Sequence, residues 1–192
     1  MHASPSSEPS RPRIYLAGPD VFFRDSEALF ERLVALCDTL GLQGVPPSDG
    51  GIAADLRLGD EERAQRIYEG NVRLIREADG VIANLTPFRG HEPDSGTVFE
   101  VGFATALGKP VVVYGVAPGT YAERVCAAVD CETGADGVIR ERASGVMVEG
   151  LGQRLNLMLT RSTEIAESAE AALVRLAERL RSDMLPAWPA AH

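Results

Sequence analysis

The sequence predicts an α/β protein whose mostly parallel sheet carries helices on both faces. Two observations support this fold class. Short apolar segments of strand length recur along the chain, and amphipathic segments of helix length separate them. Strands that alternate with helices in this way are typical of a doubly wound sheet, because each crossover places its helix on one face. With 192 residues, 45% of them hydrophobic, the chain is long enough for one domain with a substantial core.

The first predicted elements are two short strands with a helix between them. Residues 13–17 form an apolar strand that ends before a Gly-Pro pair, and residues 42–45 form the second strand. Between them, apolar residues recur at helical spacing over about 26–40, with Ser26 as a candidate N-cap. A Pro- and Gly-rich loop over 46–51 follows at the carboxyl end of the second strand.

The other elements continue this alternation. They are a helix over about 60–78, a strand over 80–85, a helix through Glu100 toward Leu107, a strand over 111–114 and an amphipathic helix over about 163–181. The strand over 80–85 is apolar throughout, as a buried parallel strand should be. We expect irregular structure over the Gly-rich segment 117–152. We also expect a single domain over 13–185, between a disordered tail over 1–12 that is rich in Ser and Pro and a C-terminal tail over 186–192.

The composition narrows the possible functions. The net charge of -9 argues against a nucleic-acid partner, because such binders usually carry a basic stripe. No apolar run reaches the ~18 residues of a membrane span and the N-terminus has no apolar signal core, so we expect a cytoplasmic protein with no membrane partner. The spacing of Cys37, Cys126 and Cys131 fits neither a disulfide framework nor a metal site. The sequence has no phosphate loop of the triphosphate- or dinucleotide-binding kind, which disfavours the usual enzymes of those two classes. We expect neither a metal nor a cofactor.

Two acidic residues mark one strand-to-helix junction. Glu100 falls in the first turns of a predicted helix, behind Ser95, Gly96 and Thr97, and Asp94 lies six residues before it. The carboxyl ends of parallel strands form the edge where ligands bind, and a helix N-terminus favours an ionised carboxylate. Two carboxylates that converge there are suited to glycosyl chemistry. Asp94 is also a candidate N-cap of this helix, a role that can coexist with ligand binding or fall to Ser95 instead.

Four segments resemble the nucleoside 2-deoxyribosyltransferase family. They are IYLAGP over 14–19, ADGVIANL over 78–85, FRGHEPDSGTVFEVG over 88–102 and NLML over 156–159. Their order and spacing cover most of the chain, and the third segment is most similar to the branch that contains protozoan and related bacterial members. The resemblance implies a flavodoxin-like (Rossmann-like) sheet of about five parallel strands. It also implies exchange of the base on 2'-deoxyribonucleosides, with free nucleobases as the second substrate.

The resemblance further assigns roles to individual residues. Glu100 matches the nucleophile that attacks the anomeric carbon, expels the base and holds the sugar covalently until a second base takes it. Asp94 matches an acid that binds the sugar hydroxyls, and Tyr15 matches an aromatic residue beside the nucleophile. Asn156 and Met158 match residues that a neighbouring subunit contributes, Asn156 to the 5'-hydroxyl. The resemblance therefore implies a homodimer or a higher homo-oligomer with shared active sites.

Some of the residues expected near the base depart from the family pattern. Gly18 and Gly96 complete the expected substrate-binding set. Asn71 stands where lactobacillus-type members carry an Asp, so the role of proton donor does not carry over to it. Asp49, in the loop after the second predicted strand, is our candidate for base contact and proton exchange, although a Pro- and Gly-rich loop equally suits an Asp that only forms a turn.

Structural alternatives exist for two other site residues as well. In the structural alternative, Tyr15 is only a core aromatic residue whose hydroxyl has a hydrogen-bond partner. Asn156 is only a turn residue that precedes an apolar segment.

Two other functions compete with base exchange. One is hydrolysis of the base from a 5'-monophosphate. In the deoxynucleotide hydrolases of this superfamily, a Ser replaces the acid that Asp94 matches. Asp94 would repel a phosphate dianion by about 1–4 kcal/mol, which favours unphosphorylated nucleosides with only weak hydrolysis beside transfer. The other is a non-catalytic nucleoside-binding protein, since a fold alone does not fix function.

Overall fold

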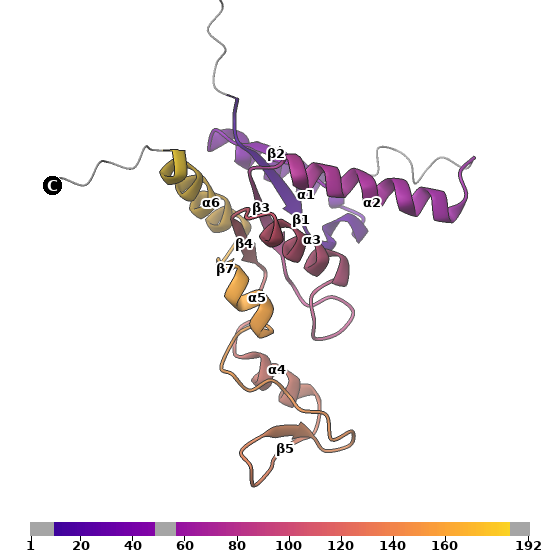
Figure 1. Ribbon diagram of the computed structural model, residues 1–192, viewed down its shortest axis with the longest axis vertical. Helices are drawn as coiled ribbons and strands as arrows, with labels where there is room; N and C mark the ends of the chain where they lie inside the picture. Colours follow the sequence, from indigo (N-terminus) through magenta and orange to yellow (C-terminus); the bar gives the residue numbers. More distant parts are fainter. Residues whose placement is uncertain (1–9, 49–56, 185–192) are drawn as a thin grey trace, which may run out of the picture.

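A parallel five-stranded sheet lies at the centre of the structure, with the strand order β2-β1-β3-β4-β7 (Figure 1). The computed structural model describes residues 10–48 and 57–184. The strands of this sheet are β1 (Arg13–Ala17), β2 (Gln43–Val45), β3 (Gly80–Asn84), β4 (Val111–Tyr114) and β7 (Glu164–Ile165). Every neighbouring pair is parallel. This order is that of flavodoxin-like sheets, so the predicted fold class is confirmed.

Helices cover both faces of the sheet. They are α1 (Ser26–Thr39), α2 (Asp60–Glu77), α3 (Ser95–Ala106), α4 (Tyr121–Ala128), α5 (Leu157–Ser162) and α6 (Ala169–Met184), with a short 3-10 helix η1 (Pro19–Phe22) after β1. Successive residues of a strand point to opposite faces. On β1, Tyr15 belongs to the buried cluster shared with α2, α3 and α5, whereas Ile14 belongs to the cluster shared with α1 and α6. Burial of both faces explains why the central strands are apolar throughout.

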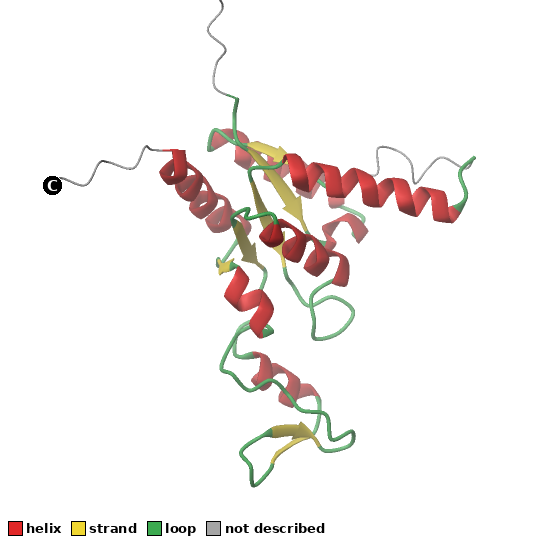
Figure 2. Ribbon diagram, in the orientation of Figure 1, coloured by secondary structure: helices red, strands yellow, loops and turns green. Residues whose placement is uncertain are grey.

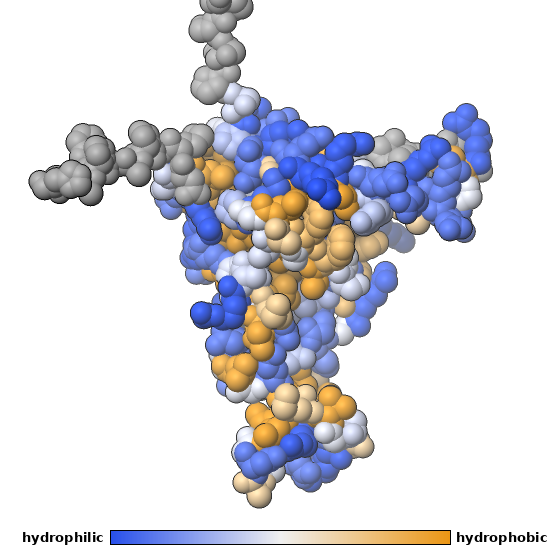
Figure 3. All heavy atoms as spheres, in the orientation of Figure 1, coloured by the Kyte–Doolittle hydropathy of each residue, from blue (hydrophilic) through white to orange (hydrophobic). Residues whose placement is uncertain are grey.

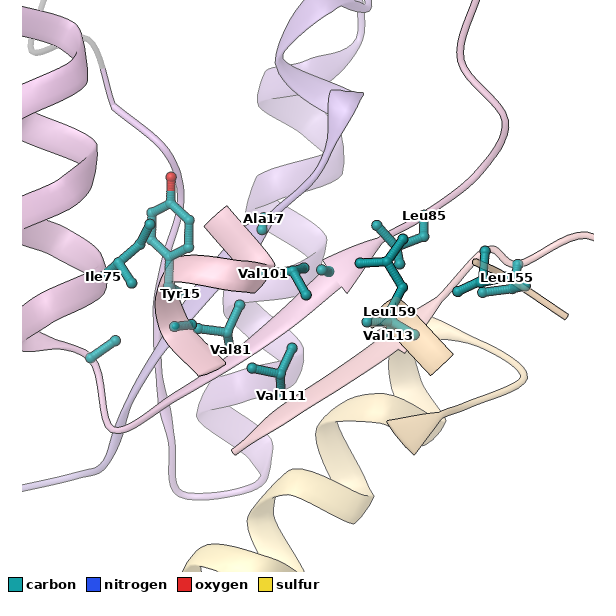
Figure 4. Packing of buried hydrophobic residues seen from close by; sticks show 14 residues of the cluster. Tyr15, Ala17, Ile75, Val81, Leu85, Val101, Val111, Val113, Leu155 and Leu159 are labelled. Carbon is teal, nitrogen blue, oxygen red and sulfur yellow. The ribbon is translucent and has the colours of Figure 1, made fainter. Parts of the chain in front are cut away.

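The cluster on the α2 and α3 side leads toward the carboxylates singled out in the sequence. Tyr15, Val81 and Val111 are all buried there. Figure 4 shows the ring of Tyr15 beside Ile75 of α2, with the hydroxyl directed away from Val81 and Val111. A buried hydroxyl needs a hydrogen-bond partner. Tyr15 therefore brings a polar group out of the apolar core on the side of the sheet that α3 covers.

Two details of the predicted helices are wrong. The helix predicted over 163–181 begins only at Ala169, and Glu164–Ile165 form the edge strand β7 instead. The backbone of this segment pairs with β4, as the bond from Ala166 N to Val113 O at 2.7 Å shows, and a strand of two residues has no alternation to detect. Ser26 is the first residue of α1 rather than its N-cap, which is Asp25.

Residues 117–155, here called the extension, are more regular than predicted. They contain α4 and an antiparallel hairpin of β5 (Cys131–Thr133) and β6 (Ile139–Glu141). Thr120 and Glu123 form a capping box that begins α4. Figures 1 and 2 show that the hairpin and α4 project from the end of the molecule that carries α5. The expectation of irregular structure is therefore wrong for these segments.

Some expectations fall outside the part of the chain that the structure describes. Asp49 lies there, as do residues 1–9 of the predicted N-terminal tail and the predicted C-terminal tail over 186–192. Within residues 10–48 and 57–184, no helix has the length and apolar character needed to cross a membrane.

Candidate active site

Tyr15 and Glu100 form a direct contact between β1 and α3. The Tyr15 hydroxyl donates a hydrogen bond of 2.6 Å to Glu100 Oε1. Tyr15 is fully buried, and Glu100 is partly buried in the second turn of α3. Tyr15 is thus a core aromatic with a satisfied hydroxyl, and the group that satisfies it is the carboxylate singled out from the sequence.

Burial shifts the proton equilibrium of this pair. Loss of solvent raises the pKa of Glu100 to about 7, although the hydrogen bond from Tyr15 opposes the shift and the charge of Asp94 adds to it. Burial, and then the charge of Glu100, raises the pKa of Tyr15, so its hydroxyl stays protonated and remains a donor. Near neutral pH, Glu100 therefore exists in comparable amounts as a carboxylate and as an acid. Perturbed acids of this kind are typical of functional sites.

Asp94 is fixed at the beginning of α3. It is the N-cap residue, and its Oδ2 accepts hydrogen bonds from Thr97 N at 2.8 Å and from Thr97 Oγ1 at 3.0 Å. Thr97 is buried, so it holds the carboxylate rigidly. Both bonds use the same oxygen, and Asp94 Oδ1 can still accept a hydrogen bond from a ligand. The capping role expected from the sequence is confirmed, and it leaves ligand binding open.

A cavity of about 260 Å³ joins these acids to the carboxyl edge of the sheet. It is lined by Gly18, Val21, Phe22, Pro47, Ser48, Ile67, Asn71, Asp94, Gly96, Thr97 and Glu100. The structure therefore brings Gly18, Asn71 and Gly96 to the same cavity as the two acids. Asn71 also holds one wall in place, because its Oδ1 accepts a 3.1 Å hydrogen bond from Ser48 N in the loop after β2.

A polar pair beside Gly18, which lines this cavity, was not predicted from the sequence. Asp20 is 5% exposed, and both of its carboxylate oxygens lie 3.1 Å from Asn84 Nδ2. Burial raises the pKa of Asp20. A Cβ atom at Gly18 would lie 2.3 Å from Asp20 Oδ2, so only glycine fits between this pair and the cavity. The sequence carried only a partial signal, because Asp20 follows β1 and Asn84 ends β3, but the strand pairing that brings them together is seen only in the structure.

Sequence reasoning also missed an aromatic group at the mouth of the cavity. The ring of Phe22 stacks on Phe88 with centroids 5.4 Å apart, and the Arg89 guanidinium lies 4.7 Å from the Phe88 centroid. Phe22 is 59% exposed although it lines the cavity. An exposed aromatic ring beside two carboxylates can stack on a planar heterocycle.

Asn156 and Met158 lie away from this cavity. They line a second and more apolar cavity of about 630 Å³, together with Glu92, Pro93, Ser95, Val98, Gly102, Thr105, Ala106, Leu159 and Ser162. Asn156 is the N-cap of α5, where its Oδ1 accepts a 3.0 Å hydrogen bond from Met158 N, and Met158 is 71% exposed. Asn156 is thus more than a turn residue, but a single chain does not place it in the cavity of Glu100.

Comparison with known proteins relates this geometry to a family. Residues 14–158 match the family model described as nucleoside 2-deoxyribosyltransferase. The chain is similar in structure to a 2-desoxiribosyltransferase from Leishmania mexicana, with a TM-score of 0.67 and 33% sequence identity over 87% of this chain and 97% of the other. A conserved protein from Enterococcus faecalis, with a TM-score of 0.53, 20% identity and coverage of 88% and 99%, shares the fold.

Curated proteins give a second set of relatives. The chain is 35% identical over 123 residues to an uncharacterized protein of Schizosaccharomyces pombe, a match that spans 63% of this chain and 58% of the other. It is 32% identical over 102 residues to the 5-hydroxymethyl-dUMP N-hydrolase of Mus musculus, spanning 52% and 54%. The chain thus matches just over half of the length of these two relatives. Because the family model covers most of the sequence, the chain belongs to the nucleoside 2-deoxyribosyltransferase family.

Proposed function

We propose that this protein transfers the 2-deoxyribosyl group from one nucleobase to another through a covalent intermediate on Glu100. The observation that carries the proposal is the position of Glu100, which Tyr15 holds at 2.6 Å in a cavity that Asp94 also lines. An anionic carboxylate beside the anomeric carbon stabilises an oxocarbenium-like transition state and can then bond to it. A protein that only binds nucleosides needs no such buried nucleophile.

In this mechanism Glu100 attacks the anomeric carbon as the glycosidic bond breaks. The electron pair of that bond leaves with the base, which takes up a proton, and the sugar remains attached to Glu100 as an ester. A second base then attacks the same carbon and releases the carboxylate, so two inversions give net retention. Asp94 binds the sugar hydroxyls, and Phe22 offers a surface on which the base stacks. Asp49 is our proposal for proton exchange with the base.

The choice between a nucleoside and a 5'-monophosphate rests on Asp94. The similarity to a 5-hydroxymethyl-dUMP N-hydrolase makes cleavage of a monophosphate the main alternative. A dianionic phosphate close to the Asp94 carboxylate would be repelled by about 1–4 kcal/mol. We therefore propose unphosphorylated 2'-deoxynucleosides as substrates, with water as a slow acceptor.

We further propose that the active unit is at least a homodimer. The outer side of α3 exposes Phe99, Gly102 and Ala106, and Figure 3 shows hydrophobic residues gathered over α3 and α5. Small residues let a second helix approach closely, and a twofold interface would bury this surface on both copies. Such an arrangement would carry Asn156 and Met158 of one copy toward the Glu100 cavity of the other.

One assay tests the proposed reaction. The full chain is incubated with a 2'-deoxynucleoside and a different free base, and the products are separated by chromatography. We expect a new deoxynucleoside from the wild type and none from Glu100→Ala, whereas the surface variant Glu132→Gln should behave as the wild type. Release of the first base without a new nucleoside would favour the hydrolase. Absence of both products would favour a binding protein.

A further inference from the structure

Glu149 in the extension makes two hydrogen bonds to the beginning of α5. Its Oε2 accepts a 3.0 Å bond from Asn156 Nδ2, and its Oε1 accepts a 2.7 Å bond from Leu157 N. Glu149 and Asn156 are both partly buried. One carboxylate thus holds both the side chain of the cap residue and the first backbone N–H of the helix.

These bonds fix which way the Asn156 amide faces. Asn156 Oδ1 accepts from Met158 N at 3.0 Å, while Nδ2 points to the Glu149 carboxylate. A flipped amide would place its oxygen against a carboxylate oxygen and its NH2 group against a backbone N–H, and both contacts are repulsive. One Nδ2 hydrogen and one Oδ1 lone pair remain for another partner. Their direction is set by Glu149.

The surroundings favour a polar partner at this point. Glu92 lines the same cavity as Asn156. A hydrogen bond to Glu92, with burial and the nearby charges of Glu92 and Glu149, raises the pKa of Tyr121 to about 12. The apolar cavity of Met158 and Leu159 therefore has a polar edge, to which the loop before α3 contributes Glu92 and the start of α5 contributes Asn156.

We propose that Glu149 is a positioning residue, which orients Asn156 so that its free amide hydrogen meets the 5'-hydroxyl of a nucleoside bound by a second copy of the chain. The inference rests on the proposed function, because it takes the shared site from there. It adds a residue that touches no substrate and acts through Asn156. It also gives the extension a part in recognition of the sugar.

The test uses binding, so that it does not depend on which reaction the protein performs. Glu149→Gln and Glu149→Asp are made in full chains that also carry Glu100→Ala, and the matched control is Glu132→Gln, a surface acid of the same extension. Calorimetry then gives the dissociation constants of a 2'-deoxynucleoside and of the 2',5'-dideoxynucleoside, which lacks the 5'-hydroxyl. The melting temperature of each variant reports on folding.

The expected result is selective. Loss of one oriented hydrogen bond should weaken binding of the 2'-deoxynucleoside by roughly three- to tenfold. Binding of the 2',5'-dideoxynucleoside should not change, and the effect should vanish when Asn156→Ala is also present. Equal loss for both ligands, or no loss for either, overturns the inference and leaves Glu149 as a cap of α5. If the loss of binding is selective but the wild type neither transfers the sugar nor cleaves the nucleoside, the proposed function alone is overturned.

Discussion

Replacement of Tyr15 by Phe tests how the core controls the proposed nucleophile. The substitution removes one hydroxyl and keeps the ring that packs beside Ile75 (Figure 4). The lost hydrogen bond, 2.6 Å from oxygen to oxygen, is one that lowers the pKa of Glu100. Its removal should therefore raise that pKa above its value of about 7. Because Phe keeps the volume of the ring, the fold should not change.

The size of this effect follows from the contact. A hydrogen bond to a charged group contributes about 1.5–3 kcal/mol, and one pKa unit corresponds to about 1.36 kcal/mol. The pKa of Glu100 should thus rise by about one to two units. At pH 7 the ionised fraction would fall from about one half to between about one tenth and one hundredth, which lowers kcat/KM by about five- to fiftyfold.

The assay is the pH dependence of kcat/KM for base exchange in the wild type and in Tyr15→Phe. Because the nucleophile must be ionised, activity should rise with pH through the Glu100 pKa, and the rise should move to higher pH in the variant. At high pH the two proteins should become similar. An equal loss at every pH would refute this reasoning and assign Tyr15 a role other than control of the Glu100 pKa.

Three further predictions concern the same site. Asp94→Ser should weaken use of 2'-deoxynucleosides and improve use of their 5'-monophosphates, because Ser still caps α3 and removes the repulsion; a variant that excludes monophosphates as strongly as the parent contradicts this. The pKa of Glu100 is about 7 in the folded protein, against its ordinary value of 4.5 in the unfolded chain. Because the folded state binds this proton more tightly, the free energy of unfolding should fall as pH rises between these two values. Glu100→Gln should then be more stable than the wild type at pH 8 by about 1–3 kcal/mol, with no gain at pH 4 by thermal or urea unfolding. When Glu100→Ala chains are mixed with Asn156→Ala chains, activity should return through hybrid sites that contain an intact Glu100 and an intact Asn156. Subunit exchange, measured by mass on tagged chains, without any return of activity would contradict the shared site.

The sequence predicted the first four strands and α1 to α3 well. Each of these strands is a short apolar run that ends near a Gly or Pro, and each helix has either a helical apolar period or, for α3, a capping acid. The edge strand β7 was missed because two residues paired only to β4 leave no pattern. The hairpin of the extension was missed for a similar reason, since β5 and β6 have three residues each.

The candidate site was predicted as far as local motifs reach. Asp94 and Glu100 share one loop and helix, and the pairing of β1 with β3 explains why Tyr15 joins them. Asp20 was missed because its partner Asn84 is distant in sequence and meets it only through that pairing. Asn156 lines the more apolar cavity of its own chain. A sequence pattern does not show whether a residue contributes to the active site of its own chain or to that of a second copy.

Mass spectrometry of the protein after exposure to a 2'-deoxynucleoside tests the central proposal most directly. Without an acceptor base, the wild type should gain the mass of one deoxyribosyl group, and fragmentation should place it on the peptide that contains Glu100. A free base added afterwards should remove this mass and yield the new nucleoside. Glu100→Ala should show neither adduct nor transfer. Transfer by Glu100→Ala within about tenfold of the wild-type rate, which is a loss of less than about 1.4 kcal/mol in transition-state stabilisation, would contradict the covalent mechanism.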